Sequence, residues 1–170
     1  MRRIAVLLVL CLAALVVPAR AATTSTKVGF DPDDRPRLGS DPDLRSTWRT
    51  VRRGPHGHGW LTVAFRAYEP LGVFWFVNVF LDTRGGPRWD YRMNLIDADL
   101  SGRGCWLRSR LDRSLNQRSR FRMGGDHASC TVPIGSIVRT KPIRWRLVSP
   151  SGSNGIADVA PNGGGWYPGG

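Results

Sequence analysis

Short segments in which apolar and polar residues alternate recur along most of this chain. Between residues 60 and 68, for example, Leu61, Val63, Phe65 and Ala67 share one face of an extended chain, and Thr62, Arg66 and Tyr68 point the other way. A period of two places the apolar side chains on one face of an extended strand, and no stretch shows the 3.6-residue apolar period of an amphipathic helix. The pattern therefore predicts an all-β fold.

Eight segments are expected to form strands, each bounded by turn residues such as Gly, Pro and Asp. They lie around residues 44–51, 60–68, 73–81, 91–95, 105–111, 118–123, 129–132 and 143–147. The segment 73–81 is almost wholly apolar, which predicts a central strand covered on both faces. Short strands joined by tight turns favour an antiparallel β-sandwich, of the jelly-roll or immunoglobulin-like kind, over a barrel.

The first 21 residues have the organisation of a secretory signal peptide. Arg2 and Arg3 precede an apolar run at residues 4–17, and Ala19-Arg20-Ala21 fits the small-residue rule for cleavage. The run is shorter than the roughly 20 apolar residues of a membrane-spanning helix. We therefore predict cleavage after Ala21 and a secreted mature chain, in the extracellular or cell-wall space, with no transmembrane segment.

Removing 21 of the 170 residues leaves 149, which is close to the commonest size of one domain. We expect an acidic N-terminal segment at 22–43, a β-sandwich core at 44–148 and a Gly/Pro-rich C-terminal segment at 149–170. Cleavage also removes Cys11 and leaves Cys105 and Cys130. In an oxidising compartment two cysteines most simply form one disulfide bond.

Aspartates cluster in the N-terminal segment, at Asp31, Asp33, Asp34, Asp41 and Asp43. Carboxylates gathered on a loop supply the hard oxygen ligands that calcium prefers, so this segment is a candidate calcium site. The alternative is that these aspartates form Asx turns and pair with neighbouring arginines. A second acidic segment, Asp82–Gly86, is predicted to be a plain hairpin turn, because Arg84 stands where a calcium loop needs a carboxylate.

The net charge is +12, and it falls to +9 when Arg2, Arg3 and Arg20 are removed with the signal peptide. Lys27 and Lys141 are the only lysines, and such a bias towards arginine is typical of a GC-rich genome. The alternative is an anion-binding sheet face, with Trp106 adding stacking, that holds teichoic acid, lipid head groups or acidic glycans; nucleic acid is disfavoured. The candidate residues for this face are Arg66, Arg92, Arg108, Arg110, Arg120, Arg122, Arg144 and Arg146.

Catalytic motifs are sparse. His56 and His58 lie in a Gly-rich segment and lack the further ligands that zinc requires. Asp126-His127 has the form of a base with its orienting acid, but the chain has no Gly-x-Ser-x-Gly motif and no phosphate-binding glycine loop. No catalytic residue is assigned, and an enzyme is the minority interpretation.

Three turn-like motifs occur in a recognisable order: Asp31–Asp34, Leu81–Gly86 followed by Asp90-Tyr91, and Asp158–Gly163. This order resembles a group of small secreted proteins of actinobacteria that have an all-β domain and no settled activity. The resemblance covers most of the mature chain. It implies a sandwich similar to carbohydrate-binding or calcium-stabilised modules, with Asp158 folded back near the N-terminal aspartates as a further calcium ligand, and it implies no reaction.

Together these features predict a secreted, non-catalytic binding or structural module of the cell envelope or exterior, with an anionic polymer or glycan as its partner. One alternative is an extracellular protein–protein module, an inhibitor or accessory subunit, with an apolar patch that includes Trp60, Trp166 and Tyr167. The other alternative is a hydrolase whose site has no recognisable motif.

Overall fold

The structure, a computed structural model, describes residues 23–32, 42–54, 58–98, 102–137, 139–150 and 157–169. The predicted signal peptide lies outside these residues. Within them, no helix has the length and hydrophobicity needed to cross a membrane.

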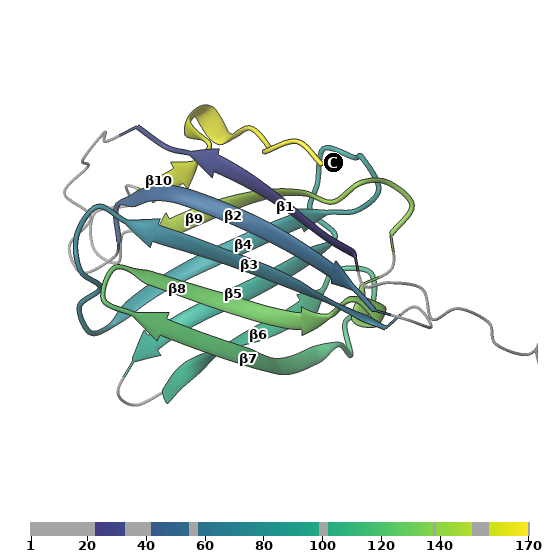
Figure 1. The fold of residues 1–170 in the computed structure, drawn as a ribbon, viewed down its shortest axis with the longest axis horizontal. Helices are drawn as coiled ribbons and strands as arrows, with labels where there is room; N and C mark the ends of the chain where they lie inside the picture. Colours follow the sequence, from purple (N-terminus) through teal and green to yellow (C-terminus); the bar gives the residue numbers. More distant parts are fainter. Residues whose placement is uncertain are drawn as a thin grey trace, which may run out of the picture.

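The described chain forms ten antiparallel strands in one sheet, with the order β1-β2-β3-β8-β7-β6-β5-β4-β9-β10. The strands are β1 (Thr23–Phe30), β2 (Leu44–Arg53), β3 (Gly59–Ala67), β4 (Trp75–Asp82), β5 (Tyr91–Ala98), β6 (Gly102–Ser109), β7 (Asn116–Gly124), β8 (His127–Pro133), β9 (Arg144–Pro150) and β10 (Ala157–Ala160). Two single-turn helices, η2 (Ile134–Ser136) and η3 (Asn162–Gly164), follow β8 and β10. The sheet curls into a nearly closed, barrel-like shape (Figure 1).

The all-β prediction is confirmed, and the eight expected strands correspond to β2 through β9. The structure adds β1 and β10 at the two edges of the sheet, outside the expected core of 44–148. Strand β1 begins Thr-Thr-Ser-Thr-Lys and is exposed at all but one position, so it shows no alternation of apolar and polar residues. It is held by its ladder with β2 and not by burial of one face.

The predicted sandwich of two separate sheets is not found: the described strands form one sheet with two facing halves. Strands β1, β2, β3, β8 and β7 lie in front of β6, β5, β4, β9 and β10 (Figure 1). The halves are not separate sheets, because β6 and β7 are hydrogen-bonded from Cys105↔Ser119 to Arg108↔Asn116. Whether a ladder continues across such a corner depends on backbone pairing, which periodicity along one chain does not encode.

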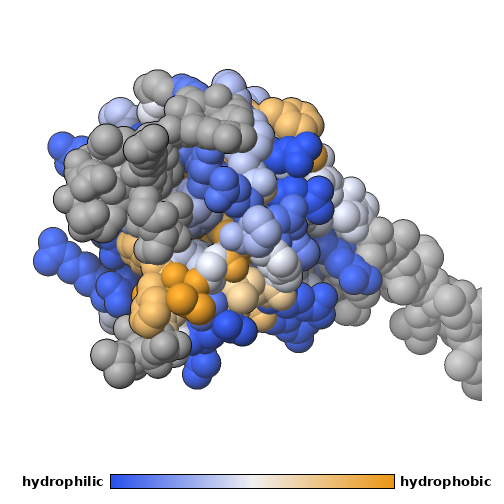
Figure 2. Space-filling view, turned by 90° about the vertical axis from the view of Figure 1, so that its left-hand side faces the viewer, coloured by the Kyte–Doolittle hydropathy of each residue, from blue (hydrophilic) through white to orange (hydrophobic). Residues whose placement is uncertain are grey.

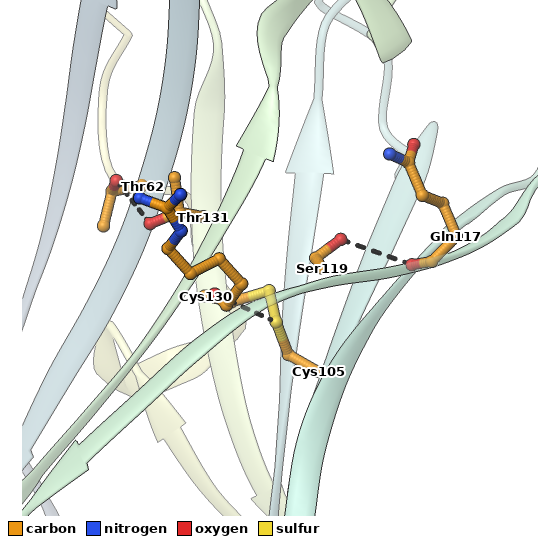
Figure 3. Close-up of a disulfide and its surroundings, with 7 residues drawn as sticks. Thr62, Cys105, Gln117, Ser119, Cys130 and Thr131 are labelled. Carbon is orange, nitrogen blue, oxygen red and sulfur yellow. Dashed lines mark hydrogen bonds between the residues drawn. A yellow bond between two sulfur atoms is a disulfide. The ribbon is translucent and has the colours of Figure 1, made fainter.

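The predicted disulfide between Cys105 and Cys130 is present (Figure 3). It joins β6 to β8, the two strands on either side of β7. In a flat sheet, strands two places apart are separated by roughly 9–10 Å. Here the Cα atoms are 5.9 Å apart, so the sheet folds sharply at β7 and the disulfide bridges the inside of the fold.

The inward-facing side chains of both halves form one continuous core. The Trp75 ring on β4 packs edge-on against Phe65 of β3, with ring centroids 5.6 Å apart, and lies 6.2 Å from the Phe121 ring of β7. The inward positions predicted from the alternation in β3 are confirmed, since Leu61, Val63 and Phe65 are fully buried.

The two sheet edges meet at a seam that the C-terminal segment closes. The Asp158 carboxylate on β10 accepts a hydrogen bond from the Leu44 backbone N–H at the start of β2, at 2.6 Å. Tyr167 pairs with the backbone of Trp145 on β9, and its hydroxyl donates to the Phe30 carbonyl at the end of β1, at 3.1 Å. A Cβ at Gly29 would overlap the Tyr167 ring, so a glycine is required there.

The turn between β4 and β5 confirms the predicted hairpin and is built around Asp82. One carboxylate oxygen accepts the backbone N–H groups of Arg84, Gly85 and Gly86, at 3.0, 2.8 and 3.3 Å. The other oxygen accepts two hydrogen bonds from the Arg144 guanidinium on β9. Burial disfavours the charged form, but the hydrogen bonds from Arg144 and from the turn outweigh it and lower the pKa of Asp82.

Candidate functional site

The outer face of β4, β5 and β6 carries aromatic, amide and arginine side chains in register. One row across the three strands is Asn78, Asn94 and Trp106, and the next row is Phe80, Arg92 and Arg108. Side chains of neighbouring strands that lie opposite one another are close enough to contact a single ligand together. The face therefore presents a surface for stacking, amides for hydrogen bonds and positive charge side by side.

A recess of about 430 Å³ opens over these rows. Its lining residues are Phe76, Asn78, Arg92, Asn94, Ile96, Trp106, Arg108 and Asn116. The expectation that segment 73–81 is covered on both faces is wrong, because its outward-facing residues Phe76, Asn78 and Phe80 are only half-buried. Neighbouring side chains of the same sheet flank these residues, and no second layer of structure is needed to account for the apolar run.

The Trp106 indole lies back across its own strand. A Cβ at Gly104 would approach the ring atoms of Trp106 at 3.0 to 3.5 Å, so the missing side chain at residue 104 makes room for the ring. Trp106 is half-buried. One part of the indole is therefore supported by the strand while the rest is available to a ligand, an arrangement that suits an amphipathic aromatic residue.

Two buried polar groups in the recess make no hydrogen bond to a described residue. The side-chain amide of Asn94 (Nδ2) donates a hydrogen bond to the side-chain oxygen of Asn78 (Oδ1) at 2.6 Å. The Asn94 carbonyl oxygen and the Arg92 Nε–H are buried without a hydrogen-bond partner among the described residues. A donor and an acceptor that are removed from water but unpaired favour a ligand that supplies both kinds of partner.

A second recess, of about 350 Å³, adjoins the first and shares Arg92, Arg108 and Asn116 with it. It extends the surface towards Trp89, Arg110 and Arg113. We call the two recesses together the outer groove. In the described part of the chain no carboxylate lies within 4 Å of Arg92 or Arg108, whereas Arg110 is 3.9 Å from Asp90. Among the described residues, the centre of the groove is therefore positively charged and has no carboxylate in contact with it.

The eight arginines proposed from the sequence do not all share one surface. Arg92, Arg108, Arg144 and Arg146 lie on β5, β6 and β9 of one half, and Arg66, Arg120 and Arg122 lie on β3 and β7 of the other. Arg110 follows β6 and donates to the Trp89 carbonyl at 2.7 Å.

Several of these arginines already have partners. Arg144 binds Asp82, and Arg66 is 3.1 Å from Asp126. The guanidinium of Arg146 lies over the Trp166 ring, 4.9 Å from its centroid. Arg92 and Arg108 are thus the members of the predicted face that line both recesses and have no ion pair with any described residue.

The three described members of the predicted calcium set do gather near the start of β2. Asp158 contacts Leu44, the carbonyl of Asp43 accepts from the Tyr68 N–H, and Tyr68 also donates its hydroxyl hydrogen to the carbonyl of Asp31. Asp33, Asp34 and Asp41 lie outside the described residues. Among those that are described, no three Asp, Glu, His or Cys side chains form a group that can hold a metal ion, and the calcium site stays a prediction.

The residues predicted for a hydrolase site and for a protein-binding patch do not gather at one place among the described residues. Asp126 and His127 are 3.1 Å apart in an exposed turn, and Asp126 also pairs with Arg66. Tyr167 is buried, Trp166 is stacked on arginines, and Trp60, which is 45% exposed, lies on the other half of the sheet. The three rings named for a protein-binding patch therefore do not form one surface.

An exposed apolar pair lies in the loop that leads from β3 into β4. Val73 and Phe74 are 62% and 52% exposed, and Phe74 has a positive φ of 62°, which is rare for a bulky residue. They precede Phe76, at one end of the outer groove, by only a few residues. The surface at this end of the barrel shows hydrophobic atoms gathered among hydrophilic ones (Figure 2).

Sequence reasoning had not included Asn78, Asn94 and Trp89 in a site. Periodicity shows which side of a strand a residue faces, but not which residues of other strands lie beside it. Comparison of the chain with models of protein families, with curated proteins and with solved structures found no match in any of the three. The resemblance to small actinobacterial proteins stays a prediction, and the ligand class has to come from the chemistry of the outer groove.

Proposed function

We propose that this chain is an exported, non-catalytic module that binds an acidic polysaccharide along the outer groove. The observation that carries the proposal is the placement of Trp106 in one recess beside Arg92 and Arg108, two arginines with no carboxylate within 4 Å in the described part of the chain. Export is supported by the N-terminal signal pattern, and the disulfide is compatible with an oxidising compartment.

Each group in the groove matches a part of an acidic sugar chain. The apolar face of a sugar ring can pack on the indole of Trp106. Its hydroxyls donate and accept hydrogen bonds, as the Asn78–Asn94 pair requires. Carboxylate or sulfate substituents can pair with the forked guanidinium groups of Arg92 and Arg108.

Binding is favoured over hydrolysis by the kind of charge present. The charged side chains that line the groove are arginines, which hold an anion but do not exchange protons near neutral pH. The groove is long and open at the surface, as a polymer requires. The protein–protein alternative has less support, because Tyr167 is buried in the seam.

The proposal predicts binding to polygalacturonate that weakens as salt rises, measured by titration calorimetry at about 50 mM and 500 mM NaCl. The matched neutral polymer, methyl-esterified polygalacturonate, is expected to bind at least about tenfold more weakly. Trp106→Ala should cost about tenfold in affinity for the acidic polymer, which corresponds to roughly 1.4 kcal/mol.

A pair of double variants separates the outer groove from general positive charge. Arg92→Gln/Arg108→Gln is expected to lower the affinity by more than about tenfold. Arg120→Gln/Arg122→Gln removes the same charge from the other half of the sheet and should leave the affinity nearly unchanged. The proposal would be contradicted if both double variants lost the same affinity for polygalacturonate. It would also be contradicted if the wild-type chain bound a single-stranded oligonucleotide of the same charge as tightly as the polysaccharide, because the chain would then bind polyanions in general.

A further inference from the structure

A further cationic recess, of about 230 Å³, lies where β1 begins. It shares no lining residue with the outer groove. Three arginines and three hydroxyl-bearing residues make up most of its lining. The residues are Thr23, Thr24, Ser25, Arg49, Val51, Arg53 and Arg139. They come from β1, β2 and the segment that follows η2. We call it the β1 recess.

Arg49 is a buried arginine that faces the interior of the barrel. It occupies an inward position on β2, between Thr47 and Val51, and is only 2% exposed. Its Nη1 donates to the Ile143 carbonyl at 2.8 Å, and the guanidinium carbon lies 5.1 Å from the centroid of the Trp145 ring. Two partners therefore fix the orientation of the guanidinium, while its Nε–H is buried with no hydrogen-bond partner among the described residues.

The charges around Arg49 are of the same sign. Burial and the positive charge of Arg139 lower the pKa of Arg49, and burial and the charge of Arg53 lower the pKa of Arg139. In the described ranges no carboxylate is within 4 Å of any of these three arginines. The neighbouring undescribed stretches, 55–57 and Val138, contain no Asp or Glu in their sequence, and neither do residues 1–22.

A buried positive charge without a counter-charge is costly, since desolvation is not offset by an ion pair. Arginine remains protonated under all ordinary conditions, so Arg49 cannot relieve this cost by losing a proton. An anion from solution would relieve it. Three converging guanidinium groups match a doubly charged oxyanion better than a single carboxylate, and arginine forks and hydroxyls are suited to phosphate oxygens.

We propose that the β1 recess is a binding site for phosphate, either as the free ion or as the terminal group of a phosphomonoester. Arg49 forms its base, with a guanidinium already fixed by Ile143 and Trp145. Arg53 and Arg139 are exposed at its rim and close on the anion from outside. Thr23, Thr24 and Ser25 line the same recess and carry hydroxyls that can add further donors.

The first test is titration calorimetry and thermal melting of the full chain with sodium phosphate, at an ionic strength held constant with NaCl. We expect saturable heat and a rise in Tm with phosphate, and no such effect with acetate at equal concentration. Glycerol phosphate in place of phosphate distinguishes the two sources: comparable or tighter binding assigns a monoester, and exclusion assigns the free ion. No phosphate-specific binding up to about 50 mM would overturn the proposal.

The second test compares arginine variants that line the β1 recess with one that does not. Arg53→Gln and Arg139→Gln are each expected to weaken phosphate binding about tenfold. Arg52→Gln removes the same charge from the adjacent exposed position, which does not line the recess, and should have little effect. If the Arg52 variant loses as much affinity as the other two, the recess is not the site.

Arg49 needs a variant that keeps the fold. Arg49→Lys retains the charge but loses the fork, and we expect weaker phosphate binding with polygalacturonate binding unchanged, which also shows that the chain is folded. Arg53→Gln should likewise leave the polymer affinity unchanged. If Arg53→Gln or Arg139→Gln lowers the affinity for both phosphate and polygalacturonate, the β1 recess and the outer groove are not independent. That result would overturn a separate phosphate site.

Discussion

Asp82→Ala is expected to lower the free energy of unfolding by about 4 kcal/mol, the largest effect of any single substitution considered for this chain. The carboxylate is fully buried and accepts hydrogen bonds from two groups of donors. It holds three backbone N–H groups of the β4–β5 turn and the guanidinium of Arg144 on β9. Removing it leaves the three backbone N–H groups of the turn without this acceptor, and Arg144 keeps only its hydrogen bond to the Gly86 carbonyl, at 2.7 Å.

A matched control is available in another turn of the same chain. Asp112 also accepts a backbone N–H and a hydroxyl, both from Ser114, but it is exposed. Asp112→Ala is therefore expected to cost less than about 1 kcal/mol, because water can replace the lost acceptor. Urea denaturation of both variants measures the difference, and equal losses would mean that burial of the Asp82 network contributes nothing.

The lowered pKa of Asp82 also makes this contribution depend on pH. The carboxylate ionises more readily in the folded chain than in the unfolded chain, where its pKa is about 4. Its stabilisation is therefore complete above about pH 4 and is lost as the pH falls through the lower, folded-state value. We expect the stability difference between the wild-type chain and Asp82→Asn to shrink as the pH is lowered below about 4.

Replacing both disulfide cysteines, as Cys105→Ala/Cys130→Ala, should lower the free energy of unfolding by about 3.5 kcal/mol. The bond closes a loop with a sequence separation of 25 residues, and the chain-entropy relation gives this value for a loop of that size. The loop contains β7, at which the two halves of the sheet fold together. The open chain would have to order that corner without a covalent link.

Reduction of the wild-type chain is an independent check, because it leaves both side chains in place. Chemical denaturation with and without a reducing agent should show a loss similar to that of the double variant. A reduced chain as stable as the oxidised one would show that the barrel corner is held by its ladders alone. A loss seen only in the alanine variant would instead assign the effect to cavities left by the two buried side chains.

Strands with one buried face could be predicted from the sequence, and strands that depend on pairing alone could not. The apolar alternation in β3 and β9 follows directly from the core that they line. Strand β1 is exposed at all but one position, and β10 has only four residues, so neither carries the pattern. Tyr167 lies in a Gly- and Pro-rich segment, and only the three-dimensional fold shows that it closes the seam.

The candidate sites were predictable in kind but not in place. Arginines facing outward were expected, yet the grouping of Arg92 and Arg108 with Trp106 depends on the register of three strands. Arg49 was missed altogether, because an arginine within an alternating strand is ordinarily taken to face solvent. Its inward position follows from the irregular pairing between Leu44 and Ser46, which shifts the alternation of β2.

Because the seam is closed by the C-terminal segment, the barrel can close only at the end of folding. A chain that is exported as proposed crosses the membrane with its N-terminus first, so β1 to β8 are available to pair before Asp158 and Tyr167 have emerged. The interior near β2 then remains open, and Arg49 lacks its contacts with Ile143 and Trp145. Both the closed barrel and the β1 recess are therefore finished only when the last strands arrive, and a chain cut short before β9 would have neither.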